Sequence, residues 1–348
     1  MTLSRRDRRS WRIFFWVSLV CAAVSAWFGI KVAPASEPWL SSALHGAITS
    51  LAIATPILLF QIKGDSWGPL RRLRRLPLIA YLALKMLFYF VAIVGGLIVS
   101  RFLLSDDIGT YIRMSPVFRQ SLVFAIGMSV TGSLFFEVGT LLGLGTLRKL
   151  LTGRYVHPRA EQMTFLLVDM KNSTGLAERL GPIRFHELLN EFFRDVADAA
   201  LECEAEIHKY VGDEAILTWS GNAGLDDGAA LSCPFVARDM IERHRARYLE
   251  RFGVVPEFRA ALHCGEIVAG EIGDIRREIA YVGDTLNVTA RMLDAARTMK
   301  HDVLVSADLL QRSTLPATQQ TGELPMLEVR GRAALLAIAA LSRVGAAP

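Results

Sequence analysis

The sequence is poor in cysteine, and neither internal repeats nor low-complexity segments stand out in it. Its four cysteines, Cys21, Cys203, Cys233 and Cys264, share no spacing typical of a metal site or of a disulfide framework. A disulfide scaffold is therefore excluded, and a reducing compartment is expected for the part of the chain that carries the last three cysteines.

The chain is rich in apolar residues, which are spread unevenly along it. Its 348 residues are 52% hydrophobic, with a mean hydropathy of +0.32, which is too apolar for an ordinary soluble enzyme. Most of this apolar character lies in residues 1–147, whereas residues 160–348 mix charged residues with alternating apolar runs. The net charge of +5 comes from arginines beside the apolar segments. Membrane topology explains such arginines better than nucleic-acid binding does, so no nucleic-acid partner is expected.

Four segments are long enough to cross a bilayer, which takes about 20 apolar residues; they cover residues 11–30, 41–62, 77–100 and 118–147. The first lacks a small-residue cleavage site and three more follow, so we interpret it as an anchor rather than a signal peptide. Arginine and lysine gather before the first segment, between the second and third, and after the fourth. The positive-inside rule therefore places both termini in the cytoplasm.

These features predict a helical transmembrane domain over residues 1–147, in contact with the lipid of the inner (plasma) membrane, and a basic linker over residues 148–162. Three polar residues, His45, Lys85 and Glu137, lie within or near the predicted spans. Lys85 and Glu137 fall at similar depth and are expected to pair, because an unpaired charge in a bilayer is costly. The pair is either structural or part of a sensing site. His45 is either tolerated near the end of a span or a haem ligand.

Residues 163–345 show the pattern of an α+β domain. The run "MTFLLVDM" (163–170) predicts a buried strand with Asp169 at its tip, and "IHKYVGDEAILTW" predicts a hairpin that turns at Gly212-Asp213. Amphipathic helices are expected after the first strand and over 229–251, and "PEFRAALHCGEIVAGEIG" is expected to form two strands around Gly265. With "DVLVSADLL", "LPMLEVRGR" and "ALLAIAALS" behind them, these elements predict a ferredoxin-like fold with appended strands.

Two carboxylates are expected to meet in this fold. Asp169 ends one predicted strand, and Asp213 sits in a hairpin turn that the fold would place beside it. Oxygen ligands with no general-base histidine pattern nearby suit Mg²⁺ or Mn²⁺. Two such ions can hold the attacking and leaving oxygens of a phosphoryl transfer. Taken singly, either aspartate is equally typical of an ordinary turn.

A helix is predicted to begin within "YVGDTLNVTAR", with Asn287 and Arg291 one turn apart on one face. Together with "FLLVDMKNST", "KYVGDE" and "RAALHCG", this stretch has the order and spacing of motifs in class III nucleotidyl cyclases. Residues from about 160 to 345 thus resemble the catalytic domain of that family.

The resemblance implies a role for each matching position. It implies that Asp169 and Asp213 bind two Mg²⁺ or Mn²⁺ ions and that Lys209 reads the purine. It further implies that Asn287 orients the ribose and that Arg291 stabilises charge at the α-phosphate. Arg259 and Arg332 match basic residues that hold the β- and γ-phosphates, as fixed cations do where negative charge develops.

One position departs from the family pattern. Seven residues before Asn287, adenylyl cyclases often carry an aspartate and many guanylyl cyclases a cysteine, whereas this chain has Ala280. Alanine offers no side-chain acceptor to the 6-amino group of adenine, a hydrogen bond worth about 0.5–1.5 kcal/mol. Lys209 still favours ATP, because an ammonium can donate to N1 of adenine but not to the protonated N1 of guanine.

The resemblance implies a homodimeric, membrane-bound adenylyl cyclase that converts ATP to cyclic AMP and pyrophosphate at sites shared between two chains. Three alternatives stay open: a guanylyl or purine-indifferent cyclase, a catalytically inactive nucleotide-sensing membrane protein, and a small membrane carrier with a regulatory domain. The membrane domain is interpreted either as a sensor of a lipid-soluble, small-molecule or redox signal, or as a plain anchor.

Overall fold

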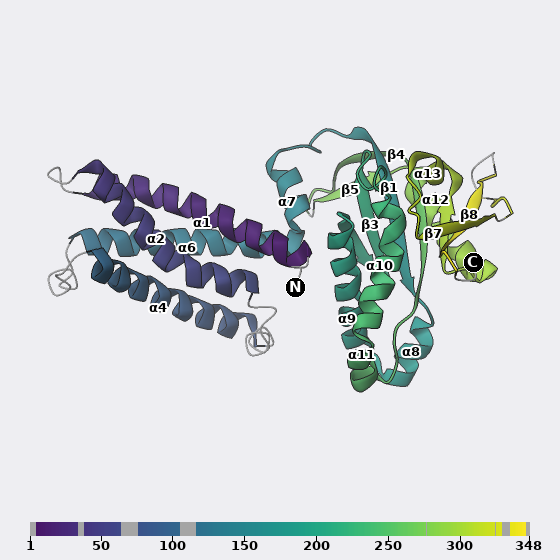
Figure 1. Cartoon of the computed structure of the whole chain (residues 1–348), viewed down its shortest axis with the longest axis horizontal. Helices are drawn as coiled ribbons and strands as arrows, with labels where there is room; N and C mark the ends of the chain where they lie inside the picture. The colour runs from purple at the N-terminus through teal and green to yellow at the C-terminus, as the bar shows by residue number, and fades with distance from the viewer. Residues whose placement is uncertain are drawn as a thin grey trace. The chain divides into compact units, whose positions relative to one another are not determined.

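The computed structural model describes residues 5–33, 38–63, 76–104, 116–275, 277–323, 325–328 and 335–345. The chain divides into two compact units, residues 1–144 and residues 145–348. Figure 1 shows that the first unit is made of helices, and that the second combines helices with a sheet.

The described residues of the first unit form four long helices, α1 (Arg5–Val32), α2 (Trp39–Lys63), α4 (Leu78–Leu104) and α6 (Pro116–Leu142). Each contains a stretch of 18 to 23 residues that is long and apolar enough to cross a membrane, which confirms the four predicted segments. The fourth prediction runs too far, because α6 ends at Leu142 and Gly143 takes a φ of 82°. Glycine adopts this left-handed conformation readily. A separate short helix, α7 (Leu144–Leu151), follows. The basic loop of residues 71–75 lies outside the described residues.

The predicted ion pair within the membrane unit is present. Lys85 Nζ on α4 lies 2.5 Å from Glu137 Oε1 on α6, with 1% of the lysine side chain and 35% of the glutamate side chain exposed. The ammonium also lies 5.9 Å and 5.8 Å from the ring centres of Tyr81 and Tyr89, at distances where an aromatic face attracts a cation. His45 lines a cavity of about 490 Å³ within the same unit, and both alternatives for it, a tolerated polar residue or a haem ligand, stay open.

The second unit is built on an eight-stranded sheet. Its strands are β1 (Arg159–Met170), β2 (Glu206–Val211), β3 (Glu214–Ser220), β4 (Phe258–Ile272), β5 (Glu278–Val282), β6 (Val303–Ser306), β7 (Gln319–Glu323) and β8 (Ile338–Arg343). They lie in the order β2-β3-β1-β4-β6-β8-β7, with β5 paired to β4. The β4–β6 pair is parallel and the other pairs are antiparallel.

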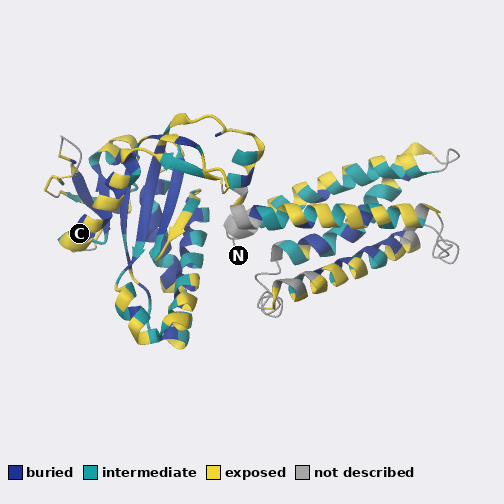
Figure 2. Cartoon of the chain, turned by 180° about the vertical axis from the view of Figure 1, so that it is seen from behind, coloured by how far each residue is buried: buried dark blue, intermediate teal, exposed yellow. Residues whose placement is uncertain are grey.

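Helices cover both faces of this sheet, and Figure 2 shows the buried strands between them. On one face Leu166 and Val168 of β1 pack in a core with residues of α9 (Pro182–Glu202) and α10 (Ala229–Arg243). On the other face Phe165 and Leu167 pack with residues of α12 (Asp284–Met299). The alternation follows from the two-residue period of a strand. The remaining helices are α8 (Ser173–Leu180), α11 (Arg245–Phe252) and α13 (Ala307–Arg312), and the predicted α+β fold is confirmed.

Two details of the sequence prediction are wrong. Residues 258–272 form the single strand β4 and not two strands around Gly265. A Cβ at Gly265 would lie 2.6 Å from Thr285 Oγ1, so glycine is needed there to let α12 approach the sheet, not to make a turn. The helix predicted over 229–251 is interrupted at His244, which separates α10 from α11.

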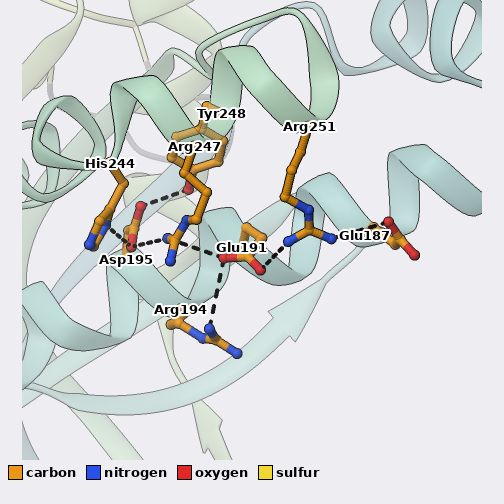
Figure 3. A network of polar contacts seen from close by, with 8 residues as sticks. All are labelled: Glu187, Glu191, Arg194, Asp195, His244, Arg247, Tyr248 and Arg251. Carbon is orange, nitrogen blue, oxygen red and sulfur yellow. Dashed lines mark hydrogen bonds and ion pairs between the residues drawn. The ribbon is translucent and has the colours of Figure 1, made fainter. Parts of the chain in front are cut away.

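A polar network holds α11 against α9 (Figure 3). The fully buried carboxylate of Asp195 accepts a hydrogen bond of 2.7 Å from Tyr248 and lies 2.9 Å from His244 Nδ1. One turn earlier on α9, Glu191 accepts from Arg251 at 2.6 Å and lies 3.1 Å from Arg247. Burial raises the pKa of Asp195, whose partners offset part of that effect. These contacts fix the position of α11 against α9, and α9 covers one face of the sheet.

The membrane ion pair gives a first prediction. Replacing Lys85 by Met leaves Glu137 without its cation inside a candidate membrane span, and we expect a loss of about 3 kcal/mol. The double variant Lys85→Met/Glu137→Gln is expected to recover most of that loss. Thermal unfolding of the full chain in detergent micelles measures both. A double variant no more stable than Lys85→Met would show that the contact is not the source of the effect.

Candidate active site

Three polar residues lie in register across the centre of the sheet. Asp169, near the end of β1, pairs with Glu214 of β3 on one side and with Arg259 of β4 on the other. Directly opposed residues of antiparallel strands project to the same face. Asp169 alternates with Phe165 and Leu167, which pack under α12. These three side chains therefore share the α12 face of the sheet.

Asp213 is brought to the same place by the hairpin between β2 and β3. Gly212 takes a φ of 62°, which glycine adopts readily and which lets the chain reverse here. The backbone N–H of Met170 donates to the carbonyl of Asp213 at 3.4 Å and ties the turn to the end of β1. The side chains of Asp169 and Asp213 are in hydrogen-bonding contact. The two aspartates thus lie side by side, as the sequence predicted.

The electrostatics of this carboxylate cluster are unfavourable without a counter-ion. Burial and the neighbouring Asp213 raise the pKa of Asp169 to about 6, against the opposing charges of Arg297 and Arg259. Burial, followed by Asp169, Asp213 and Asp294, raises the pKa of Glu214 to about 7. Like charges that share a partly buried site resist ionisation together, and a bound cation reverses that effect.

The donor set fits a hard divalent cation. Asp169 and Asp213 offer carboxylate oxygens, and Mg²⁺ is commonly held by one or two carboxylates together with substrate phosphates. Within the described ranges, no group of three or more His, Cys, Asp or Glu side chains is arranged to hold a metal ion. Two carboxylates suit an ion that completes its coordination with phosphate and water.

A second group of polar residues joins β2 to β5. Lys209 Nζ lies 3.7 Å from Glu278 Oε2. The pairing of β2 shifts between Ile207 and Lys209, and the His208 ring stacks on Tyr281 with the ring centres 4.3 Å apart. Because β5 pairs with β4 and not with β2, the ion pair and this ring stack, and not backbone hydrogen bonds, link the two strands.

Ala280 lies on β5 opposite Gly270 of β4. It is two residues from Glu278, so that both positions share one face of the strand. Glu278 contributes the carboxylate of this region, and Ala280 contributes a methyl group. Strand alternation in "EIAYV" is a signal from which Glu278 could have been found.

Asn287 and Arg291 lie one turn apart on the exposed side of α12, so the helix predicted from the sequence is confirmed. Further along the same helix, the charge of Arg297 acts on Asp169. At a rise of about 1.5 Å per residue, Asn287 is about 15 Å along the helix axis from Arg297. Within a single chain, Asn287, the predicted ribose residue, therefore lies far from the end of α12 that neighbours the carboxylates.

The predicted site residues that the structure describes thus fall into three groups in one chain. The first is Asp169, Asp213 and Arg259, the second is Lys209 and Ala280, and the third is Asn287 and Arg291 on α12. Arg332 lies outside the described residues. Sequence reasoning missed Glu214 and Arg297. Glu214 could have been inferred, because a hairpin turning at Gly212-Asp213 places the next residue beside the end of β1. The position of Arg297 depends on how α12 packs across the sheet.

Comparison with known proteins gives concordant results. The family model described as the adenylate and guanylate cyclase catalytic domain matches residues 155–337. A protein named adenylate cyclase 2, from Rhizobium meliloti (strain 1021), is 36% identical over 310 residues, which cover 86% of this chain and 83% of that protein. An adenylate cyclase from Anabaena cylindrica is 24% identical over 159 residues, which cover 44% of this chain and 31% of that protein.

Among solved structures, a bacterial light-regulated adenylyl cyclase superposes with a TM-score of 0.53 at 14% sequence identity. The alignment covers 63% of this chain and 64% of that one. At this level of identity the likeness concerns the fold.

The carboxylate pair gives a second prediction. Because the pKa of Asp169 in the folded chain, about 6, exceeds its ordinary value of 3.8, its contribution to stability is present below pH 3.8 and is lost as the pH rises through 6. In the presence of a chelator, Asp169→Asn is therefore expected to be about 1–2 kcal/mol more stable than the natural chain at pH 8, after allowance for solvent screening, and closer to it at pH 5. Thermal unfolding of the full chain measures this difference.

Hydrogen exchange supplies a local readout for the same variant. Mn²⁺ is expected to protect the ends of β1 and β3 in the natural chain and not in Asp169→Asn. The exposed Asp226→Asn is a matched control that should retain the protection. Equal protection by Mn²⁺ in Asp169→Asn would contradict a metal site at this pair.

Proposed function

The chain belongs to the family of adenylate and guanylate cyclases, and from this premise we propose that it is a membrane-bound adenylyl cyclase. It converts ATP to 3′,5′-cyclic AMP and pyrophosphate. The observation that carries this proposal is the contact between Asp169 and Asp213 beside Arg259, on the sheet face under α12. The position of Lys209 in "KYVGDE" supports ATP as the nucleotide.

The proposed reaction joins the ribose 3′-oxygen to the α-phosphorus and breaks the bond from that phosphorus to pyrophosphate. Asp169 and Asp213 would hold two Mg²⁺ or Mn²⁺ ions, which when bound neutralise the triphosphate and lower the pKa of the 3′-hydroxyl. Arg259 is suited to bind the β- and γ-phosphates, because its register with Asp169 places its Cα beside the aspartates proposed to hold the metal ions. Arg332 is proposed as the second phosphate ligand.

Asn287 and Arg291 have a separate task in this proposal. Asn287 orients the ribose, and Arg291 stabilises the charge that develops on the α-phosphate oxygens. Both side chains are exposed on α12, where a nucleotide held by a second chain can reach them. No covalent bond to the protein is required.

We infer that two chains form each site. Asn287 lies about 15 Å along α12 from the residue that acts on Asp169, so one copy does not present both sets of residues to one nucleotide. In a head-to-tail homodimer, the carboxylates of one copy would face Lys209, Asn287 and Arg291 of the other. Twofold symmetry then produces two equivalent sites.

The membrane unit is proposed to anchor the enzyme in the inner membrane with both termini in the cytoplasm, as the distribution of arginine and lysine implies. A coupling role is supported by α7. Lys149 lies 2.6 Å from Glu206 of β2 and 3.5 Å from the hydroxyl of Tyr281 on β5. The segment that follows the last membrane helix is thus bonded to both strands of the Lys209 region.

Product analysis tests the activity itself. The purified full-length chain is expected to form cyclic AMP from ATP with Mg²⁺ or Mn²⁺, and to use GTP less well because Lys209 cannot donate to the protonated N1 of guanine. Cyclic nucleotides are measured by liquid chromatography and mass spectrometry. Cyclic GMP as the main product would favour the guanylyl cyclase alternative. No product from either nucleotide, in the presence of normal nucleotide binding, would favour an inactive sensing domain.

Mixing of variants tests the shared site. Asp169→Ala and Arg291→Ala chains are each expected to be inactive as homodimers. Co-expressed in equal amounts, half of the dimers are mixed and carry one intact site of two, so roughly a quarter of the natural activity should return. The matched control mixes Asp169→Ala with Asp213→Ala, in which both sites of every mixed dimer stay damaged. Recovery in neither mixture would contradict the shared-site arrangement.

A further inference from the structure

The ion pair between Lys209 and Glu278 is exposed. The charged groups lie 3.7 Å apart, with 47% of the lysine side chain and 44% of the glutamate side chain accessible. Exposed pairs of this kind contribute about 0–1 kcal/mol to stability. The pair is therefore a weak structural contact, and both charged groups are accessible to a third molecule.

Contacts between the strands nevertheless fix the backbone positions of Lys209 and Glu278. Lys209 follows His208, whose ring is stacked on Tyr281, and Glu278 lies three residues before that tyrosine on the same strand. Tyr281 in turn contacts Phe165 of the core edge-on, with the ring centres 6.0 Å apart. The aromatic contacts therefore hold β2 and β5 at a set separation, and the Lys209 and Glu278 side chains extend from these strands.

The ion pair also contains a hydrogen-bond acceptor, the carboxylate of Glu278, close to a position that lacks one. Ala280 offers no side-chain acceptor to a nucleotide base. Glu278 is on the same face of β5, two residues or about 7 Å away along the strand. Its side chain is one methylene longer than aspartate, and its carboxylate is the one that approaches Lys209.

Adenine presents an acceptor, N1, and a donor, its 6-amino group, on neighbouring positions of one edge. An ammonium and a carboxylate placed side by side offer the complementary donor and acceptor. Guanine reverses this order, with an acceptor at O6 and a donor at N1. A lysine aimed at N1 therefore selects adenine, and a carboxylate beside it can receive the 6-amino hydrogens.

We propose that Glu278 reads the 6-amino group of adenine, in place of the acceptor that Ala280 lacks, while Lys209 donates to N1. The proposal rests on the adenylyl cyclase function proposed above and names a specificity residue of that site. Glu278 and Lys209 act on the base, whereas Asp169 and Asp213 act on the phosphates.

Nucleotide analogues separate the two contacts. We compare ATP with purine riboside triphosphate, which lacks the 6-amino group, and with 1-deaza-ATP, which lacks N1. A hydrogen bond to a charged group is worth about 1.5–3 kcal/mol, so the natural chain is expected to prefer ATP over the 6-unsubstituted analogue by about 10–100-fold in kcat/KM. In Glu278→Ala this preference should fall to within a few-fold, while the preference for ATP over 1-deaza-ATP persists.

Two further variants sharpen the test. Glu278→Gln keeps an acceptor without charge and should retain an intermediate preference. Glu278→Ala/Ala280→Asp moves a carboxylate two residues along the same strand face and should restore the preference for the 6-amino group. Glu323→Ala, which removes an exposed glutamate from the distant edge strand β7, is the matched control and should change neither ratio.

The opposite results are equally specific. If Glu278→Ala abolishes discrimination at N1 and keeps it at the 6-amino group, Glu278 only positions Lys209. If both preferences are unchanged, the ion pair plays no part in base recognition, and either result overturns the proposal. Binding of 3′-deoxy-ATP and its 6-unsubstituted analogue, neither of which can cyclise, repeats the comparison without turnover. A chain that makes no cyclic AMP but binds with the expected preference would refute the activity and support the role of Glu278.

Discussion

The burial of neighbouring carboxylates at the ends of β1 and β3, together with their mutual repulsion, is the constraint on which the catalytic unit depends. Strand register alone puts Glu214 opposite Asp169, and the Gly212-Asp213 turn adds another carboxylate. The raised pKa values of Asp169 and Glu214 show how unfavourable this arrangement is without added positive charge. Arg259 and Arg297 supply part of that charge from the protein. A bound divalent cation would supply more positive charge, and its binding would relieve part of this electrostatic cost.

The arrangement of α12 sets the distance on which the proposed two-chain site rests. The helix runs along the sheet, and Gly265 lets its first turn lie close to β4, where Thr285 donates to the carbonyl of Glu266 at 2.8 Å. With that end fixed, the helix length determines how far Asn287 stands from the carboxylates. This rigid separation supports the proposed two-chain site, in which turnover would depend on how the two copies are oriented.

The sequence was sufficient for features that follow from local periodicity. Alternating and continuous apolar runs predicted β1 and the β2–β3 hairpin, and matching depth in two spans predicted the Lys85–Glu137 contact. Gly265 was misinterpreted because a glycine inside a strand pattern is typical both of a turn and of a close approach. The decision between them depends on Thr285, twenty residues away. The neighbourhood of Lys209 and Glu278 was similarly hidden, because it arises from a ring stack between strands that do not pair.

The same ring stack connects the region of Lys209 and Glu278 to the linker. Tyr281 stacks on His208, and its hydroxyl lies 3.5 Å from Lys149, which also bonds to Glu206 on β2. Burial, then the charges of Lys209 and Lys149, lower the pKa of His208 to about 4, so the ring is neutral near pH 7 and adds no charge beside Lys209. Helix α7 therefore contacts the strands that carry Lys209 and Glu278, whereas the carboxylate pair is held by β1, β3 and the hairpin turn. A displacement of α7 would act first on the region of Lys209 and Glu278 and only through the sheet on Asp169 and Asp213.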